Sequence, residues 1–247
     1  MPATRPPHAM PSERRTRLVL NGSELLRIQT TPVALDDWAT GFLFTEGMIN
    51  QLGDLQRLEV DAASGQVVAE VNPDGLPDQA MAGKRYLTSG CGKGVTFSSI
   101  KDVMGLQPVR HPLRVDRVQL VAWIKWMQRQ TPLYEESGGM HAAAVSHVPS
   151  GEMLVREDIG RHNAVDKAIG AALKAGFPAE ELVLLTTGRI SYEMCSKMAR
   201  AGIGIGASLT AATDQAIRLA ERLQIDLVGY VRSPEKLVIY TRGTRIG

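Results

Sequence analysis

The stretch LVLLTTGRISYEMCSKMARAGIGIGASL, residues 182–209, decides the fold class of this chain. It opens with an apolar run, Leu182–Thr187, that is typical of a buried strand. A glycine turn and Ser191, a favourable N-cap residue, then lead into a helix predicted for Ser191–Ala201. A second apolar run, Ile203–Leu209, follows at once. A strand, a helix and a strand at this spacing predict a crossover unit between two parallel strands.

The same alternation extends to both sides of this unit. The further predicted elements are, in chain order, a helix marked by Val118–Met127, strands over Met140–His147 and Met153–Arg156, helices over Val165–Leu173 and Ala212–Leu223, and strands over Ile225–Val231 and Leu237–Thr241. We therefore expect residues 115–247 to form a C-terminal layered α/β domain with a largely parallel core sheet.

Residues 16–114 indicate a small, strand-rich N-terminal domain with one helix, which makes the chain α+β as a whole. The dipeptide Asn21-Gly22 predicts a hairpin, because both residues tolerate positive φ. The predicted elements are strands over Arg17–Leu20 and Leu25–Thr31, a helix over Leu35–Ile49, and a second hairpin of Leu55–Asp61 with Gln66–Val71. Gln107–Arg117 is the predicted linker, and residues 1–15 are predicted to form a disordered tail.

The composition argues against several classes of protein. The 28 basic and 26 acidic residues nearly balance, which disfavours binding to nucleic acid. No apolar run approaches the roughly 20 residues that span a bilayer, and the N-terminus lacks a secretory signal, so we expect a cytoplasmic protein without a membrane partner. Two cysteines and five histidines show no metal-ligand spacing, so we expect no metal held by protein side chains.

The two cysteines have opposite surroundings. Cys91 lies between glycines in an open loop, where Lys93 favours the thiolate, the reactive form of the side chain. Cys195 is accompanied on its predicted helix by Met194 and Met198, on the face that packs inward. We therefore predict a reactive thiol at Cys91 and a buried structural thiol at Cys195.

Two arginines follow predicted strands, at positions where α/β sheets bind ligands. Arg161 precedes a helix, and Arg189 lies in the glycine turn after Leu182–Thr187. Helix N-termini and guanidinium groups both attract anions, so this pair favours a phosphate-bearing ligand. The alternative stays open that Glu157 or Asp158 caps the helix and that the arginines pair with these carboxylates at the surface.

A set of characteristic segments runs in order over nearly the whole chain from residue 17. The longest is Glu157-Asp158-Ile159-Gly160-Arg161-His162-Asn163-Ala164. The others are Asn21-Gly22, Thr31-Pro32, Gly41-Phe42, Thr45-Glu46-Gly47, Gly90-Cys91-Gly92, Gly139 with His141-Ala142-Ala143, Asp166-Lys167, Gly188-Arg189 with Ser191-Tyr192-Glu193-Met194, and Leu227-Val228-Gly229-Tyr230. Together they resemble the FdhD family of formate dehydrogenase accessory sulfurtransferases.

The resemblance implies a function and a set of site residues. Members of the family take persulfide sulfur from a cysteine desulfurase and deliver it to the molybdenum cofactor of formate dehydrogenase, a bis(molybdopterin guanine dinucleotide). By this resemblance Cys91 carries the persulfide, and the cofactor contacts Tyr230, Val231, Arg232, Ser233, Pro234 and Glu235, while its phosphates suit Arg161 and Arg189. The resemblance also implies a homodimer, and a C-terminal domain similar to cytidine deaminase without the zinc ligands of that enzyme.

Two positions depart from the family pattern. Many members carry Cys-x-x-Cys in the cysteine loop, but Gly94 stands at the second position here, which excludes an intramolecular disulfide in this loop. Ser233-Pro234-Glu235 stands where a more basic stretch is expected, although Arg232 remains. The missing cysteine favours an alternative function, a cofactor-binding chaperone without covalent sulfur transfer. A third possibility, a nucleotide-processing hydrolase, finds no readable site for an activating metal.

Overall fold

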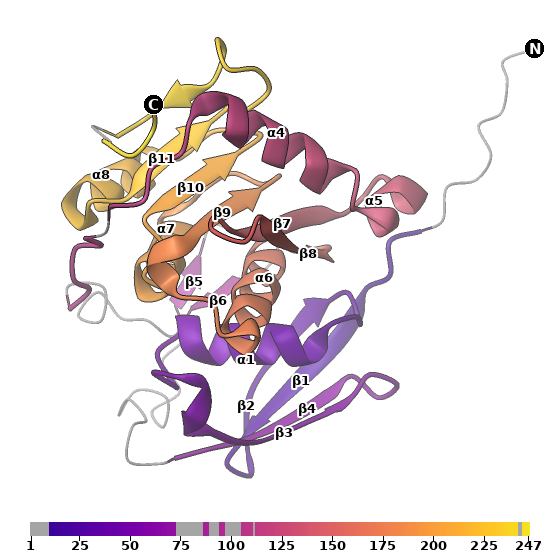
Figure 1. Ribbon diagram of the computed structural model, residues 1–247. Helices are drawn as coiled ribbons and strands as arrows, with labels where there is room; N and C mark the ends of the chain where they lie inside the picture. The colour runs from indigo at the N-terminus through magenta and orange to yellow at the C-terminus, as the bar shows by residue number, and fades with distance from the viewer. Residues whose placement is uncertain (1–9, 73–85, 89–93, 97–104, 111, 242–243) are drawn as a thin grey trace, which may run out of the picture.

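Two main sheets, with helices packed between and around them, form the protein in the computed structural model (Figure 1). The structure describes residues 10–72, 86–88, 94–96, 105–110, 112–241 and 244–247. One sheet has four strands and belongs to the N-terminal part of the chain, and the other has six strands and belongs to the C-terminal part. The fold class predicted from the sequence, a strand-rich N-terminal part followed by a layered α/β part, is confirmed.

The N-terminal sheet has the strand order β2-β1-β4-β3. Its strands are β1 (Arg14–Leu20), β2 (Ser23–Thr30), β3 (Leu55–Asp61) and β4 (Gln66–Val71). The predicted turn is confirmed, because Asn21 has φ 47° and Gly22 has φ 78°. The Asn21 side chain also bonds both the N–H and the C=O of Val71, which fixes the turn against β4. Strand β1 begins inside the segment predicted as a tail, because Arg14 pairs with Thr30.

The C-terminal sheet has the strand order β12-β11-β10-β9-β7-β8. Its strands are β7 (His141–His147), β8 (Glu152–Asp158), β9 (Leu182–Thr186), β10 (Ile205–Ser208), β11 (Asp226–Gly229) and β12 (Val238–Ile239). Only the pairs β9–β10 and β10–β11 are parallel. The prediction of a largely parallel sheet was therefore wrong, because most neighbouring strands of this sheet are antiparallel. A tight turn makes β7 and β8 an antiparallel hairpin, and β7 also runs antiparallel to β9.

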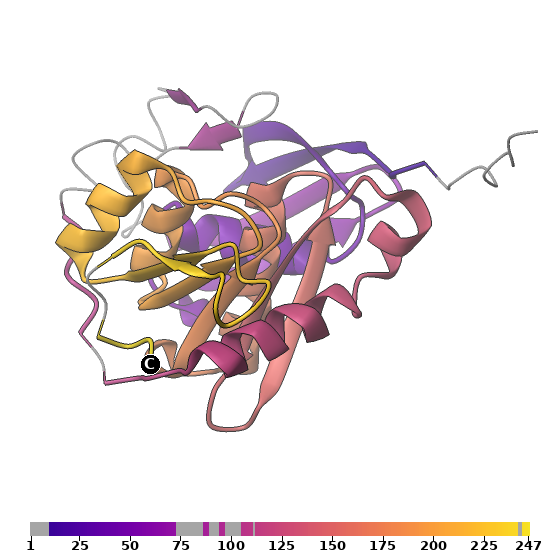
Figure 2. The same ribbon diagram turned by 90° about the horizontal axis from the view of Figure 1, so that it is seen from above.

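Helices cover both faces of the six-stranded sheet (Figures 1 and 2). The helices are α1 (Leu35–Thr45), α4 (Arg117–Gln128), α5 (Pro132–Ser137), α6 (Arg161–Ala175), α7 (Tyr192–Arg200) and α8 (Asp214–Leu223), with 3-10 turns at Leu52–Asp54 and Ala179–Glu181. Helix α4 packs on one face, and α6, α7 and α8 pack on the other. Helix α1 ends before the predicted Ile49, because Gly47 turns the chain with φ 77°. The short helix α5 was not predicted.

The two parts of the chain share one hydrophobic core through helices α1 and α6. Trp38 and Phe42 of α1 belong to the same buried cluster as Val165 and Ile169 of α6. Two glycines let the helices approach closely: a Cβ atom on Gly41 would overlap the carbonyl oxygen of Asp166, and one on Gly170 would overlap that of Asp37. The contact between α1 and α6 thus depends on the absence of two side chains.

A Gly41→Ala variant is expected to lose about 3 kcal/mol of unfolding free energy, the upper end of the usual cost of overpacking a core. The added methyl group would push α1 away from the backbone of α6. Urea unfolding followed by circular dichroism measures the change. Gly53→Ala is the matched control, because the nearest atom to its added Cβ would be the Gln51 Nε2 atom at 4.0 Å, and it should shift stability by less than about 0.5 kcal/mol. Equal stability of the two variants would contradict the close-packing argument.

The predicted linker lies along the C-terminal part of the chain. Within residues 107–117, the Val109 N–H donates to the carbonyl of Leu223 at 2.8 Å, and the Val115 N–H donates to the carbonyl of Arg245 at 2.8 Å. Both valines are buried. The described part of this segment therefore packs as an outer layer of the C-terminal half.

A short two-stranded sheet pairs β5 (Tyr86–Thr88) with β6 (Gly94–Thr96). Cys91 and Lys93 fall between these strands and lie outside the described residues. Over the ranges that the structure describes, there is no cluster of three or more His, Cys, Asp or Glu side chains arranged to hold a metal ion. Nor does any helix in those ranges have the length and apolar character to cross a membrane.

Candidate functional site

One edge of the six-stranded sheet gathers the predicted ligand-binding residues. Strands β8, β9, β10 and β11 all end there, and β7 begins there, since His141 pairs with Asp158 and Ala143 pairs with Thr186. We call it the carboxyl edge. In open α/β sheets this is the edge at which ligands bind.

Hydrogen bonds join the loops of the carboxyl edge to one another. The Ser208 hydroxyl, at the end of β10, donates to the carbonyl of Gly188 in the loop after β9 at 2.8 Å. The Tyr230 N–H, just after β11, donates to the carbonyl of Thr210 in the loop after β10 at 3.0 Å. The three loops after β9, β10 and β11 therefore form one connected surface.

Arg161 and Arg189 lie together on this surface. The sequence predicted for each of them separately a position after a strand. Arg161 is the first residue of α6, and the residue is 7% exposed. It lies against the loop after β9, because a Cβ on Gly188 would stand only 2.9 Å from the Arg161 Cβ. Arg189 follows directly and is exposed to solvent. The glycine thus brings a buried and an exposed guanidinium group onto one surface.

Two histidines accompany these arginines. Burial lowers the pKa of His141, and the positive charges of Arg161 and Arg189 lower it further. Burial also lowers the pKa of His162, together with the charges of Arg161 and Lys197, to about 3. Both imidazoles are therefore neutral at pH 7. His162 directly follows Arg161 in the sequence, whereas the place of His141 beside them depends on the antiparallel direction of β7.

His162 contacts the start of helix α7. Its Nε2 atom lies 3.4 Å from the Ser191 hydroxyl and 4.0 Å from a Glu193 carboxylate oxygen. A neutral imidazole can donate or accept a hydrogen bond at this nitrogen. The N-termini of α6 and α7 therefore meet around His162, and both ends present backbone N–H groups toward the carboxyl edge.

The two acidic residues before Arg161 bond elsewhere. The Asp158 carboxylate lies 2.7 Å from Lys167 Nζ, and it accepts the N–H groups of Thr31 and Gly160 at 3.0 and 2.8 Å. The Glu157 carboxylate accepts the N–H groups at the start of α5 at 2.8 and 3.0 Å. Both carboxylates thus have structural partners within the fold.

A second buried lysine fixes the end of α1 beside the site. Lys197 Nζ lies 2.8 Å from Asp166, 2.9 Å from Glu46 and 2.9 Å from the Thr45 hydroxyl. All four side chains are buried. Because Asp166 and Lys197 belong to α6 and α7, this cluster holds both helices whose N-termini reach the carboxyl edge.

The predicted cofactor segment, Tyr230–Glu235, lies in the loop between β11 and β12. Tyr230 adopts a left-handed conformation with φ 53° and is 44% exposed. Such a conformation in a non-glycine residue costs energy and is common in functional loops. Val231 is buried and donates its N–H to the carbonyl of Ser208 at 3.0 Å, while Arg232 is exposed. The segment therefore lies on the same connected surface as Arg161 and Arg189.

Cys195 is fully buried on α7, and burial raises the pKa of its thiol to about 12. The predicted structural thiol is confirmed. A thiol with this pKa carries almost no thiolate at neutral pH, and the thiolate is the nucleophilic form. Cys195 is therefore unsuited to sulfur transfer.

In a Cys91→Ala variant, Cys195 is the only remaining thiol. A thiol-specific dye at pH 7.5 is expected to label none of it in the native protein and one thiol per chain in denaturant, because burial blocks access. Rapid labelling of the native variant would show that α7 opens readily and would contradict the structural assignment.

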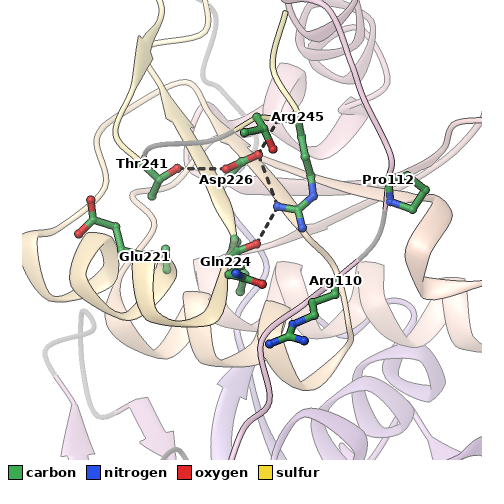
Figure 3. Close-up of a pocket in the computed structure, with 10 residues that line it drawn as sticks. Arg110, Pro112, Glu221, Gln224, Asp226, Thr241 and Arg245 are labelled. Carbon is green, nitrogen blue, oxygen red and sulfur yellow. Dashed lines mark hydrogen bonds and ion pairs between the residues drawn. The ribbon is translucent and has the colours of Figure 1, made fainter.

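A pocket of about 870 Å³ lies at the opposite edge of the sheet, where β11 begins (Figure 3). The Arg245 guanidinium donates to the carbonyls of Gln224 and Val109, both at 2.7 Å, and lies 3.5 Å from the Asp226 carboxylate. These contacts anchor the C-terminal segment. The buried acid and base of this pocket, Asp226 and Arg245, thus pair with each other.

Comparisons with known proteins find relatives over almost the whole chain. The model of the FdhD/NarQ family matches residues 11–247. The chain is 34% identical to the sulfur carrier protein FdhD of Bacillus subtilis (strain 168), over 96% of this chain and 90% of that protein. It is 33% identical to the sulfur carrier protein FdhD of Wolinella succinogenes, over 95% of this chain and 81% of that protein.

A solved structure shares the fold. The crystal structure of a proposed formate dehydrogenase accessory protein from Desulfotalea psychrophila superposes with a TM-score of 0.76 at 24% identity, covering 96% of this chain and 90% of that chain. The family match extends over almost the whole sequence, and relatives above 30% identity cover nearly the same length. The chain with the carboxyl-edge arginines and the buried Cys195 therefore belongs to the FdhD/NarQ family.

Proposed function

We propose that this protein is a sulfur carrier that accepts persulfide sulfur at Cys91 and delivers it to the molybdenum cofactor of formate dehydrogenase. Relatives of similar length are named sulfur carrier protein FdhD. The observation that carries the assignment to Cys91 is the burial of Cys195. The chain has two cysteines, so a carrier role falls to the other one.

The loading step needs a thiolate and a persulfide donor such as a cysteine desulfurase. The Cys91 thiolate attacks the outer sulfur of the donor persulfide, so a new S–S bond forms at Cys91 while the donor's S–S bond breaks. The donor cysteine leaves as a thiolate, and no net oxidation or reduction occurs. Lys93 raises the fraction of thiolate by its positive charge.

The cofactor is the substrate of the second half of the proposed function. Its phosphates suit the guanidinium groups of Arg161, whose side chain lies against Gly188, and of Arg189 and Arg232 on the same surface. The helix N-termini of α6 and α7 add N–H donors to this surface. The carboxyl edge thus supplies the kind of groups that bind a large, phosphate-bearing molecule.

A second function is favoured by one observation, the glycine at position 94. Without a second loop cysteine, the protein could bind and protect the cofactor without covalent sulfur chemistry. Such a chaperone would use the carboxyl edge in the same way. It would gain no sulfur from a donor.

Intact mass spectrometry separates the two functions. The purified full chain is incubated with an active cysteine desulfurase and cysteine, then measured before and after treatment with a reductant. A gain of one or more sulfur atoms that the reductant removes is the expected result. No gain, with a desulfurase that loads a known acceptor in parallel, would overturn the sulfur-carrier proposal in favour of the chaperone.

A further inference from the structure

The loop between strand β8 and helix α6 leads directly into Arg161 at the carboxyl edge. Gly160, the N-cap residue of α6, has no side chain with which to cap the helix. The loop is fixed instead by Asp158, at the end of β8, which accepts the Gly160 N–H at 2.8 Å and the Asn163 side-chain amide at 2.9 Å. The other oxygen of this carboxylate lies 2.7 Å from Lys167 Nζ. One carboxylate thus holds the loop and the first two turns of α6.

The N-terminal half of the chain contacts the same loop through Thr31, which lies between β2 and α1. The Thr31 N–H donates to the Asp158 carboxylate at 3.0 Å, and the Thr31 carbonyl accepts from Lys167 Nζ at 3.0 Å. The Thr31 hydroxyl accepts the N–H of Ile159 at 3.1 Å. All three polar groups of this one residue therefore bond to the segment that precedes and begins α6.

A second contact between the halves runs through the Asn163 amide, which also donates to the carbonyl of Gln29 at 2.9 Å. Hydrogen bonds to charged groups are stronger than neutral ones, and breaking a buried one leaves a polar group unpaired. The chain around Thr31 and the loop before α6 are therefore expected to move as one unit. We call the four buried residues that join them the β8–α6 clamp: Thr31, Asp158, Asn163 and Lys167.

We propose that the β8–α6 clamp lets the N-terminal half position Arg161 and His162 for a phosphate-bearing ligand at the carboxyl edge. This inference rests on the proposed function, which supplies such a ligand. The clamp residues are positioning residues, because Thr31 is 2% exposed and Asp158 is 0% exposed, so neither is open to a ligand. A binding site needs such supporting contacts to keep its own groups in place. Because coupling between two sites is reciprocal, a ligand that engages Arg161 should also stabilise the chain around Thr31.

The test compares two neighbouring threonines in the full chain and uses GDP as the phosphate-bearing probe. Thr31→Val removes the hydroxyl that holds the loop and keeps the backbone contacts of the clamp. Thr30→Val is the matched control, because Thr30 is also buried and its hydroxyl bonds that of Thr16 at 2.6 Å, inside the N-terminal sheet. Each variant loses one buried hydrogen bond, so urea unfolding should show similar losses of stability.

GDP binding is expected to separate the two variants. Calorimetry should give an affinity about fivefold weaker than that of the wild type for Thr31→Val, roughly the contribution of one hydrogen bond, and within about twofold for Thr30→Val. Asn163→Ala removes two contacts and should weaken binding at least about tenfold. Hydrogen exchange gives a second measurement. GDP should slow exchange in the wild-type peptide that contains Thr31, and Thr31→Val should abolish this protection.

Equal GDP affinities of Thr31→Val and Thr30→Val would overturn the positioning role, and so would GDP protection confined to the C-terminal half. In both cases GDP still binds the wild type, so only this inference fails. If GDP does not bind the wild type at all, the cofactor half of the proposed function fails and this inference fails with it. Persulfide loading of the wild type is measured separately, so failure of the sulfur-carrier step appears there and not in the GDP titration.

Discussion

A Lys197→Met variant is expected to lose about 3–5 kcal/mol of unfolding free energy, the range found when one partner of a buried ion pair is removed. Lys197 is the cation between Asp166 and Glu46, at 2.8 and 2.9 Å, and both carboxylates are buried. Methionine has a similar length but no charge. The substitution would therefore leave two carboxylates in the core without the cation that neutralises them.

The effect should depend on pH in a defined direction. Burial raises the pKa of Asp166 to about 6 from an ordinary value of 3.8, while Lys197 opposes the shift. A carboxyl whose pKa is higher in the folded state stabilises the fold at low pH, and this stabilisation is lost as the pH rises through 6. Loss of Lys197 raises the pKa of Asp166 further. The stability deficit of the variant should therefore be larger at pH 8 than at pH 5.

Lys174→Met is the matched control. Lys174 pairs with Asp36 and lies 2.8 Å from Asp37, but its side chain is 38% exposed. Asp37 keeps a second partner, Arg156, at 2.6 Å. We expect a loss of at most about 1 kcal/mol, as for other exposed pairs. Urea unfolding of both variants at pH 5 and pH 8 gives the comparison, and equal losses would show that Lys197 is not the neutralising partner described above.

Local features of the fold could be predicted from the sequence because they depend on neighbouring residues. The turn at Asn21-Gly22 and the end of α6 at Gly176 follow from the conformations that these residues adopt. The direction of β7 could not be predicted, because it depends on which strand it pairs with after the chain has folded. The close contact of α1 and α6 at Gly41 and Gly170 is likewise set by two distant segments.

The candidate site, like the fold, could be predicted from the sequence only in part. Arg161 and Arg189 could be placed at strand ends from the sequence, but the position of the Arg161 side chain against Gly188 required the structure. Lysine side chains on a helix are normally exposed to solvent. Lys167 and Lys197 are nevertheless buried, because each has carboxylate partners on other elements. The neutral state of His162 could not be predicted either, because it arises from burial beside Arg161 and Lys197.

The other large effect is expected at Cys91. A Cys91→Ala variant should gain no sulfur from a cysteine desulfurase, whereas the wild-type chain gains at least one reducible sulfur atom. Cys195 cannot replace it, because burial raises the pKa of that thiol to about 12 and removes it from solvent. With Gly94 at the position of a second loop cysteine, no neighbouring thiol can take over the sulfur. Intact mass before and after reduction measures the loss.

Cys195→Ala provides the control and should load as the wild type does, since its side chain takes no part in the transfer. Truncating a buried cysteine leaves only a small cavity, and thermal unfolding of all three proteins shows whether each is folded under the loading conditions. Loading that persists in Cys91→Ala and disappears in Cys195→Ala would show that Cys195, on α7, carries the sulfur. That result would require α7 to open during transfer, because in the closed structure Met194 and Met198 are buried in the same core cluster as the Cys195 thiol.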